Sequence, residues 1–416
     1  MPPTGPATAS GRPAPPARGG VLLLVVTALL VLTQLYAAIP LLGPVAGALG
    51  SDVTFALSTV FSLCYAAGFL VWGPVSDHVG RRRVLVIGLV LLAATTLACG
   101  FASTVSALAL LRGAQGFAAA SFAPTALAYL SEALPSRRRP GAIGAMSAAF
   151  LLAGIFGQVL ASIVAMHADW PWLFHGCGIA LALLAALVVR LPTEPASEER
   201  PQRSVTFGSR LLATANAATK PAVLLLCAAH VTLLLSFVGM YTALGPHLDA
   251  LGLDASQVIW IRSAGLPCMF AALAVGPLAQ RLGMAGVARA GYLLAACGIA
   301  AAALFADSLA GIIATGLLFV TGVALAIPAM ITLFGEATAP NRAGGMALNG
   351  FVLFLGASIG PLVARGPIAY APLLVVFAVL LSAAALCLTV FARIADKPEA
   401  AARDARSPRR RTEVSA

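Results

Sequence analysis

The chain has 416 residues, of which 60% are hydrophobic and only 10% are charged. A soluble domain carries about 25% charged residues, so this composition excludes an ordinary soluble protein and predicts an all-helical integral membrane protein. The formal net charge of +11 does not indicate nucleic-acid binding, because the basic residues gather in predicted loops and tails on one side of the membrane.

Both ends of the chain are expected to be cytoplasmic tails. Residues 1–20 are rich in proline, alanine and glycine, a composition typical of disorder. The apolar run from Val21 to about Leu42 is longer than the apolar region of a signal peptide, so we expect a first span and no cleavage. Residues 394–416 form a basic tail.

Twelve apolar runs are long enough to cross a bilayer, which takes about 20 residues. They are residues 21–44, 56–76, 84–102, 106–131, 142–166, 172–191, 221–246, 257–279, 287–305, 309–333, 344–365 and 369–393. An even number of spans puts both termini on one side, and the arginine-rich loops identify that side as the cytoplasm. The seven cysteines are scattered without a CxxC pair, so neither a disulfide framework nor a metal site is expected.

The connection between the second and third spans holds charges between two apolar helices, so it is expected at a membrane face. Gly80 permits a sharp reversal, and Asp77 is placed to pair with an arginine or to accept from a helix N-terminus. The pattern consists of Gly73, Asp77, Gly80, Arg81 and Arg82. A plain tight turn with a positive-inside signal is the alternative interpretation.

This pattern resembles the loop between helices 2 and 3 of the major facilitator superfamily, G-x-x-x-D-x-x-G-R-[RK], at every fixed position. The resemblance covers residues 21–393. It implies twelve helices in two pseudo-symmetric six-helix bundles, with a substrate site between them near the membrane midplane. Within the family, the chain looks most like bacterial inner-membrane permeases of the arabinose-efflux and drug:proton antiporter type.

The fourth span carries a basic residue inside an apolar helix. Arg112, Gln115 and Gly116 resemble the R-x-x-Q-G pattern of proton-coupled members of the family. A buried guanidinium must be paired or hydrated. The resemblance implies that Arg112 tunes a proton-accepting group or an anionic substrate. An arginine that extends to the outer interface is the alternative.

Glu132 and Glu336 end the fourth and tenth spans at the predicted cytoplasmic face. We expect Glu132 to pair with Arg81 or Arg82 beside Asp77. Such a cluster would hold the two halves closed on the inside when the transporter faces out. Exposed acids that contribute less than about 1 kcal/mol are the alternative.

Small residues in the fifth and eleventh spans are expected to let helix backbones approach closely. These helix-packing residues are Gly154, Gly157, Gly356, Gly360 and Pro361. Gln158 stands where the drug-antiporter pattern of the fifth helix has proline, which leaves the antiport direction open.

The polar stretch 192–220 divides the spans into an N-terminal half, residues 21–191, and a C-terminal half, residues 221–393. We expect it to be a cytoplasmic linker with a short amphipathic helix at 207–217 on the membrane surface. The halves also repeat each other. Gly73-Pro74 corresponds to Gly276-Pro277 and Gly157 to Gly360, each 203 residues on, and Pro124 corresponds to Pro328, 204 residues on.

No aspartate or glutamate lies in the middle of a predicted span. The polar candidates for the cavity or for proton coupling are Gln34, Tyr36, Arg112, Gln115, Gln158, His230 and Asn349. His230 has a suitable titration range, although a lone histidine on an apolar helix is more often a packing residue. Arg262, near the outer end of the eighth span, is interpreted as interfacial.

An apolar cavity with few fixed charges suits amphipathic or neutral cargo, with Phe122, Tyr241, Phe351 and Phe354 as candidate walls. We expect a monomer in the lipid bilayer that exports small molecules by alternating access in exchange for protons. A nutrient importer or uniporter is the first alternative, and a non-transporting sensor or scaffold is the second. The sequence has no Walker, GxSxG or HExxH motif, so we expect neither an enzyme nor a cofactor.

Overall fold

The computed structural model describes residues 18–192 and 207–406, and every regular element within these ranges is helical. The N-terminal half contains α1 (Arg18–Tyr36), α2 (Ala38–Leu49), η1 (Phe55–Thr59), α3 (Val60–Val79), α4 (Arg81–Cys99), α5 (Val105–Ala119), α6 (Phe122–Ala133), α7 (Arg139–His167) and α8 (Pro171–Val188). The linker helix is α9 (Phe207–Ala218). The C-terminal half contains α10 (Pro221–Ala250), α11 (Ala255–Ser263), η2 (Leu266–Ala274), α12 (Val275–Leu304), α13 (Leu309–Ala337), α14 (Arg342–Ala364) and α15 (Tyr370–Arg406).

The predicted tails lie mostly on residues 1–17 and 407–416, and most of the predicted polar linker lies on residues 193–206, all outside the described residues. The helix expected at 207–217 is present as α9.

Eleven helical segments of the described chain are long and apolar enough to cross a membrane. One of them, Ala255–Leu304, has 50 residues. A straight helix of that length would measure about 75 Å, more than twice the hydrocarbon thickness of about 30 Å. The chain turns within this segment at Gly283, whose φ of 70° is open to glycine. The segment therefore supplies two spans, and the predicted twelve-span fold is confirmed.

Two spans in the N-terminal half are interrupted near their middles by prolines that lack a backbone donor. Pro40 cannot donate to the carbonyl of Tyr36, and the first span breaks there between α1 and α2. Pro124 likewise cannot donate to Ala120, and the fourth span breaks between α5 and α6. The second span starts with the wider turn η1, in which the backbone N–H of Val60 bonds the carbonyl of Phe55.

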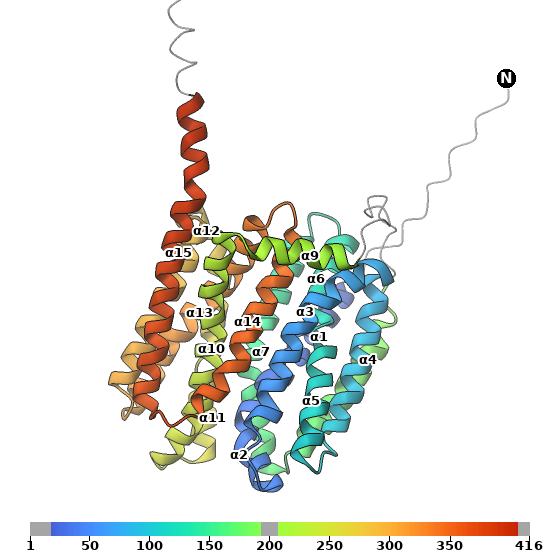
Figure 1. The fold of residues 1–416 in the computed structure, drawn as a ribbon. Coiled ribbons are helices and arrows are strands. Elements are labelled where there is room, and N and C mark those ends of the chain that lie inside the picture. Colours follow the sequence, from blue (N-terminus) through green and yellow to red (C-terminus); the bar gives the residue numbers. More distant parts are fainter. Residues whose placement is uncertain (1–17, 193–206, 407–416) are drawn as a thin grey trace, which may run out of the picture.

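The two halves use the same helix pairings. In the N-terminal half α1 packs on α7 and α4 packs on α8, and the corresponding pairs in the C-terminal half are α10 with α14 and α12 with α15. The halves stand side by side in Figure 1. They meet along two seams, one between α3 and α14 and the other between α7 and the α11–η2 segment.

Three of the small residues predicted for helix packing lie at close helix approaches. A Cβ atom on Gly157 of α7 would lie 3.0 Å from the Thr33 carbonyl oxygen of α1, and one on Gly360 of α14 would lie 2.7 Å from the Leu235 carbonyl oxygen of α10. A Cβ on Gly356 would overlap the Val231 carbonyl oxygen. Pro361 is buried beside them. Gly154 differs, because it faces the ring of Phe237 across the halves at an ordinary 3.5 Å.

Helix α9 lies across one end of the bundle, against both α3 and α14 (Figure 1). The turn between α3 and α4 and the beginning of α1 lie at the same end, which we call the α9 face. Leu211 and Leu212 on α9 are exposed. This pattern fits a helix whose apolar side rests on a bilayer surface, as expected from the sequence.

Candidate functional site

A cavity lies between the two halves, with about 1040 Å³ of space not filled by protein atoms. Its walls come from α1, α3, α6 and α7 of the N-terminal half and from α10, η2, α13 and α14 of the C-terminal half. Met346, one turn into α14 from the α9 face, lines the cavity and is 41% exposed. Tyr36 and Phe237, at its inner end, are almost fully buried. The cavity is therefore reached from the α9 face.

The wall residues repeat with the offset seen in the sequence. Pro124 and Pro328, 204 residues apart, both line the cavity, as do Leu127 and Ile331 at the same offset. The two halves thus present corresponding helix faces to the cavity. The near-constant offset is the signal that relates wall residues of one half to those of the other.

The cavity wall is apolar and aromatic. Tyr65 and Phe69 of α3 lie against Phe354 of α14, with ring centroids 4.3 and 5.5 Å apart. Tyr36 of α1 meets Phe237 of α10 edge to face at 6.0 Å. Both contacts join the two halves. Among the described residues, none of the side chains that line this cavity is charged.

Four of the described lining residues carry a polar side chain, and they are Tyr36, Tyr65, Ser147 and Asn349. Tyr36 and Asn349 were predicted as cavity residues, whereas Tyr65 and Ser147 were not. Of the aromatic walls expected from the sequence, Phe354 lines this cavity, and Phe122 and Phe351 do not. Tyr241 lines a different pocket.

The end of the molecule opposite the α9 face is closed by contacts between the halves. Arg262 of α11 donates through Nη1 to the Gln158 Oε1 of α7 at 3.3 Å, and both residues are buried. Thr59 donates to the Ser358 carbonyl at 2.9 Å across the other seam. The interfacial interpretation of Arg262 is wrong, because its side chain points between the halves and is only 3% exposed.

Asp52, in the loop before η1, is stabilised as an anion mainly within its own half. Hydrogen bonds from the hydroxyl and the backbone N–H of Thr54 hold the pKa of Asp52 below its ordinary value. The positive charge of Arg365, on the other half, lowers this pKa further. Thr54 is the main cause of the lowered pKa, and the charge of Arg365 adds a smaller attraction across the interface.

The charged residues of the α3–α4 turn form a compact cluster at the α9 face. Arg81 places Nη2 2.5 Å from the Asp77 carboxylate and 3.1 Å from Glu132 Oε1, and its Nη1 donates to Ser76 Oγ at 2.6 Å. Gly80 allows this arrangement because its φ is 103°, which lets α4 start directly at Arg81.

The expected pairing of Glu132 with Arg81 is therefore present, between α6 and α4. Arg82 donates instead to the backbone carbonyl of Val189. A Cβ on Gly73 would meet nothing within 4 Å, so close packing does not require glycine there in this conformation.

Arg112 is buried inside the N-terminal half, and its side chain is not among those lining the central cavity. Its Nε donates to the Leu57 carbonyl at 2.7 Å, Nη1 to Gln115 Oε1 at 2.6 Å and Nη2 to the Gln34 carbonyl at 3.1 Å. The guanidinium also lies over the Phe61 ring at 4.2 Å. All of these acceptors are neutral.

Gln115 extends this network, donating to Thr96 Oγ1 at 2.8 Å and to Gln34 Oε1 at 3.3 Å. Gly116 allows α5 to approach α3, because a Cβ there would overlap the Phe61 carbonyl. Gln34, Arg112 and Gln115 are thus brought together as predicted residues, but in a site separate from the cavity.

His230 lies in the core of the C-terminal half rather than in the cavity wall. Its Nδ1 is 3.4 Å from the hydroxyl of Tyr292, which donates to the Ala229 carbonyl at 3.0 Å. Its ring packs beside Phe334. These contacts match the packing interpretation of a lone buried histidine.

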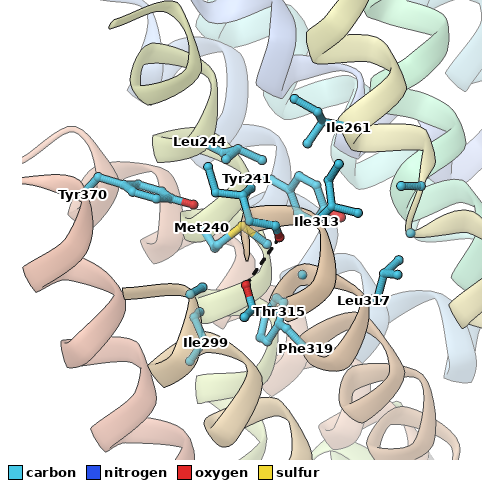
Figure 2. Close-up of a pocket in the computed structure, with 15 residues that line it drawn as sticks. Met240, Tyr241, Leu244, Ile261, Ile299, Ile313, Thr315, Leu317, Phe319 and Tyr370 are labelled. Carbon is cyan, nitrogen blue, oxygen red and sulfur yellow. Dashed lines mark hydrogen bonds between the residues drawn. The ribbon is translucent and has the colours of Figure 1, made fainter. Parts of the chain in front are cut away.

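A smaller pocket with about 470 Å³ of unfilled space lies within the C-terminal half, between α10, α11, α12, α13 and the start of α15. Figure 2 shows it lined by aliphatic side chains with the hydroxyls of Tyr241, Thr315 and Tyr370. Thr315 donates to carbonyls of its own helix, so this hydroxyl is already satisfied. Gly265 separates this pocket from the interface between the halves, where Ile155 packs against it.

Comparison with known proteins gives a consistent picture. A family model described as the Major Facilitator Superfamily matches residues 24–261, more than half of the chain. Multidrug resistance protein 3 of Bacillus subtilis (strain 168) is 29% identical over 135 residues, which are 32% of this chain and 26% of that protein. Multidrug resistance protein MdtL of Klebsiella pneumoniae is 28% identical over 168 residues, 38% of this chain and 43% of that protein. The chain therefore spans less than half the length of these relatives.

Solved structures share the fold at low sequence identity. A bacterial homologue of the human lysosomal transporter Spinster, in an inward-facing and unoccupied conformation, has a TM-score of 0.69 and 16% identity, covering 90% of this chain and 96% of that one. A point mutant of the nucleoside transporter NupG has a TM-score of 0.67 and 16% identity, covering 89% of this chain and 99% of that one.

Proposed function

The chain belongs to the major facilitator superfamily, and from this premise we propose that it is a secondary transporter that exports small amphipathic or neutral molecules by alternating access, in exchange for protons. It is not an enzyme, since the family consists of membrane transporters. The observation that carries the proposal is the apolar cavity between the two halves, reached from the α9 face and closed at the other end.

The sidedness of the proposal rests on charge. Arg81, Arg82 and Arg83 lie at the α9 face, and positive residues favour the cytoplasmic side of a bacterial inner membrane. On this assignment both termini are cytoplasmic and the structure is inward-facing. The cargo would enter from the cytoplasm or the inner leaflet and leave after the halves rock about the cavity.

The cluster of Asp77, Arg81 and Glu132 is our candidate for the cytoplasmic gate. In the inward-facing structure its described contacts join α3, α4 and α6 of one half. Rocking would bring the beginning of α14 toward this cluster, since α3 already packs along α14. Asp77 would then interact with both Arg81 and the other half. This interaction would bias the equilibrium between the inward-facing and outward-facing states.

Export is supported by the relatives that match part of this chain, which are named multidrug resistance proteins. For proton coupling, the candidates are the Arg112 network with Gln34 and Gln115, and His230. The lack of a carboxylate among the described residues of the cavity wall favours the alternative of an importer or uniporter that needs no proton gradient.

The test uses everted membrane vesicles that contain the full chain, with the uncharged dye Nile red as the probe. Proton-driven export predicts that dye accumulates in the lumen when the lumen is acidic and that an ionophore abolishes the accumulation. Counterflow that is indifferent to the pH gradient would establish the importer or uniporter instead. If no flux occurs in reconstituted liposomes either, the chain is a sensor or scaffold and the proposal is wrong.

A further inference from the structure

Two hydrogen-bond donors at the cavity wall have no partner in the described part of the chain. They are the hydroxyl of Tyr65 on α3 and the amide Nδ2 of Asn349 on α14. The two residues are 1% and 5% exposed, and both line the cavity. Buried polar groups are nearly always bonded in native proteins, and an exception calls for an explanation.

The seam between α3 and α14 carries both of these donors. Phe69, one turn from Tyr65, packs so closely on Gly350 that a Cβ there would overlap its ring. Phe354, one turn from Gly350, lies against Tyr65 at a centroid distance of 4.3 Å. Asn349 shares its helix face with Met346 and Leu353, which also line the cavity. The donors therefore sit at the edge of an aromatic surface formed by both halves.

The seam between α7 and η2, which corresponds to the α3–α14 seam in the repeat, carries different side chains. At the offset of 203 residues, Tyr65 corresponds to Cys268 of η2, next to the cavity-lining Met269, and Asn349 corresponds to Met146 of α7. Both methionines are buried. Ser147 is the polar residue that lines the cavity on this side, and its counterpart is Gly350. On this seam, the thioether of Met269 faces the cavity where the α3–α14 seam has its unpaired donors, whereas Met146 is buried away from the cavity wall.

We propose that the central cavity recognises an uncharged aromatic molecule through a hydrogen-bond acceptor, such as a carbonyl oxygen, that bonds Tyr65 and Asn349 on the α3–α14 seam. This inference rests on the proposed function only in taking the cavity as the cargo site. The acceptor faces the two donors, and the ring packs between the Phe354 surface and the Tyr36–Phe237 pair. Met269, on the other seam, contacts the apolar remainder of the molecule.

The charges of the described structure support the neutral cargo. None of the described side chains in the cavity wall is acidic, so a cation would be desolvated there without a counter-charge. None of them is basic either, and the buried guanidinium of Arg112 is already engaged with three acceptors outside the cavity. A neutral acceptor avoids both penalties and satisfies donors that are otherwise unpaired.

The experiment measures binding of matched probes to the full chain in lipid nanodiscs by equilibrium dialysis against empty nanodiscs. Benzophenone and diphenylmethane have the same two rings and differ in a carbonyl versus a methylene. Benzyltriphenylphosphonium serves as the aromatic cation. We expect benzophenone to bind about fivefold tighter than diphenylmethane, the range of one net hydrogen bond, and the cation to bind more weakly than either.

Two variants remove one donor each, Tyr65→Phe and Asn349→Leu. Each should lower the carbonyl preference at least about twofold, with little change for diphenylmethane. Met269→Leu and Met146→Leu are the matched controls on the other seam, and they should keep the preference of the wild-type chain. Tyr65→Phe keeps the ring contacts, so it remains informative if Asn349→Leu fails to fold.

Equal affinity for the two neutral probes, tighter binding of the cation, or no saturable binding of benzophenone would overturn the inference. Loss of the carbonyl preference in the methionine variants alone would also overturn it. This binding measurement requires neither a pH gradient nor transport of the probe. Carbonyl-dependent binding without transport would refute the proposed function and support the recognition chemistry. Transport without the carbonyl preference would support the proposed function and refute the recognition chemistry.

Discussion

The substitution Gly356→Ala tests the close approach of α14 and α10, on which any rocking of the C-terminal half depends. A Cβ atom at this position would overlap the Val231 carbonyl oxygen and lie 3.0 Å from the Val231 carbonyl carbon and 3.1 Å from the Leu235 nitrogen. All three atoms belong to backbone, so no side chain can swing aside. The helices must separate instead.

The magnitude follows from two opposing effects. Overpacking a fitted interface costs about 1–3 kcal/mol, whereas alanine is a better helix former than glycine by up to about 1 kcal/mol. We expect a net loss of about 1–2 kcal/mol. At an unfolding entropy of about 2.1 cal/mol/K per residue, a chain of 416 residues shifts by about 1 °C per kcal/mol, so the apparent melting temperature should fall by about 1–2 °C.

The assay is the apparent melting temperature of purified protein in detergent, followed by size-exclusion chromatography after heating. Gly176→Ala is the control, because a Cβ on Gly176 of α8 meets nothing within 4 Å and should leave the melting temperature unchanged or raise it. The N-terminal half has Ala153 at the equivalent position, 203 residues earlier. If Gly356→Ala melted like the wild type, the tight α10–α14 approach would be refuted.

Three further predictions concern the charged and polar clusters. Asp77→Asn should abolish Nile red transport while leaving membrane insertion normal, and Asp307→Asn in an exposed loop is the control. If the Asp77→Asn variant transported at the wild-type rate, Asp77 would have no role in the gate. Arg112→Lys should lower the melting temperature by several degrees, since an ammonium cannot reproduce the three donors that contact Leu57, Gln115 and Gln34, whereas Arg365→Lys should not. Gln158→Leu leaves Arg262 buried without the amide acceptor and should cost about 1–3 kcal/mol, and adding Arg262→Met should restore most of that loss. Additive effects of the two changes would contradict a direct contact.

The proposals on transport direction and coupling depend on residues that the structure has separated into three sites. Tyr36 and Asn349 line the cavity, Arg112 and Gln115 sit in a hydrogen-bond network inside the N-terminal half, and His230 lies in the core of the C-terminal half. A proton that affects cargo binding must therefore act through helix packing. Arg112 contacts cavity-forming helices through the Gln34 carbonyl of α1 and the Phe61 ring of α3, and it bonds the Leu57 carbonyl in the wide turn before α3.

The sequence by itself determined the number of spans, the family and the internal repeat. These follow from strong constraints, because a span needs about 20 apolar residues, charge is excluded from the bilayer centre and positive loops mark one side. The charge cluster at the α3–α4 turn was predictable for the same reason. Glu132 and Arg81 had few places to lie other than the same face of the membrane.

Only the tertiary structure decided which side of each span faces the cavity. In a soluble protein the apolar stripe of a helix identifies its inner face, but in a bilayer both the lipid and the neighbouring helices accept apolar side chains. Tyr65 and Phe69 were therefore missed as wall residues. Arg262 was assigned to the membrane–water interface, although it lies between the two halves. The rotation of each helix is fixed by close contacts such as those at Gly116, Gly157 and Gly356, which depend on the shape of the partner helix.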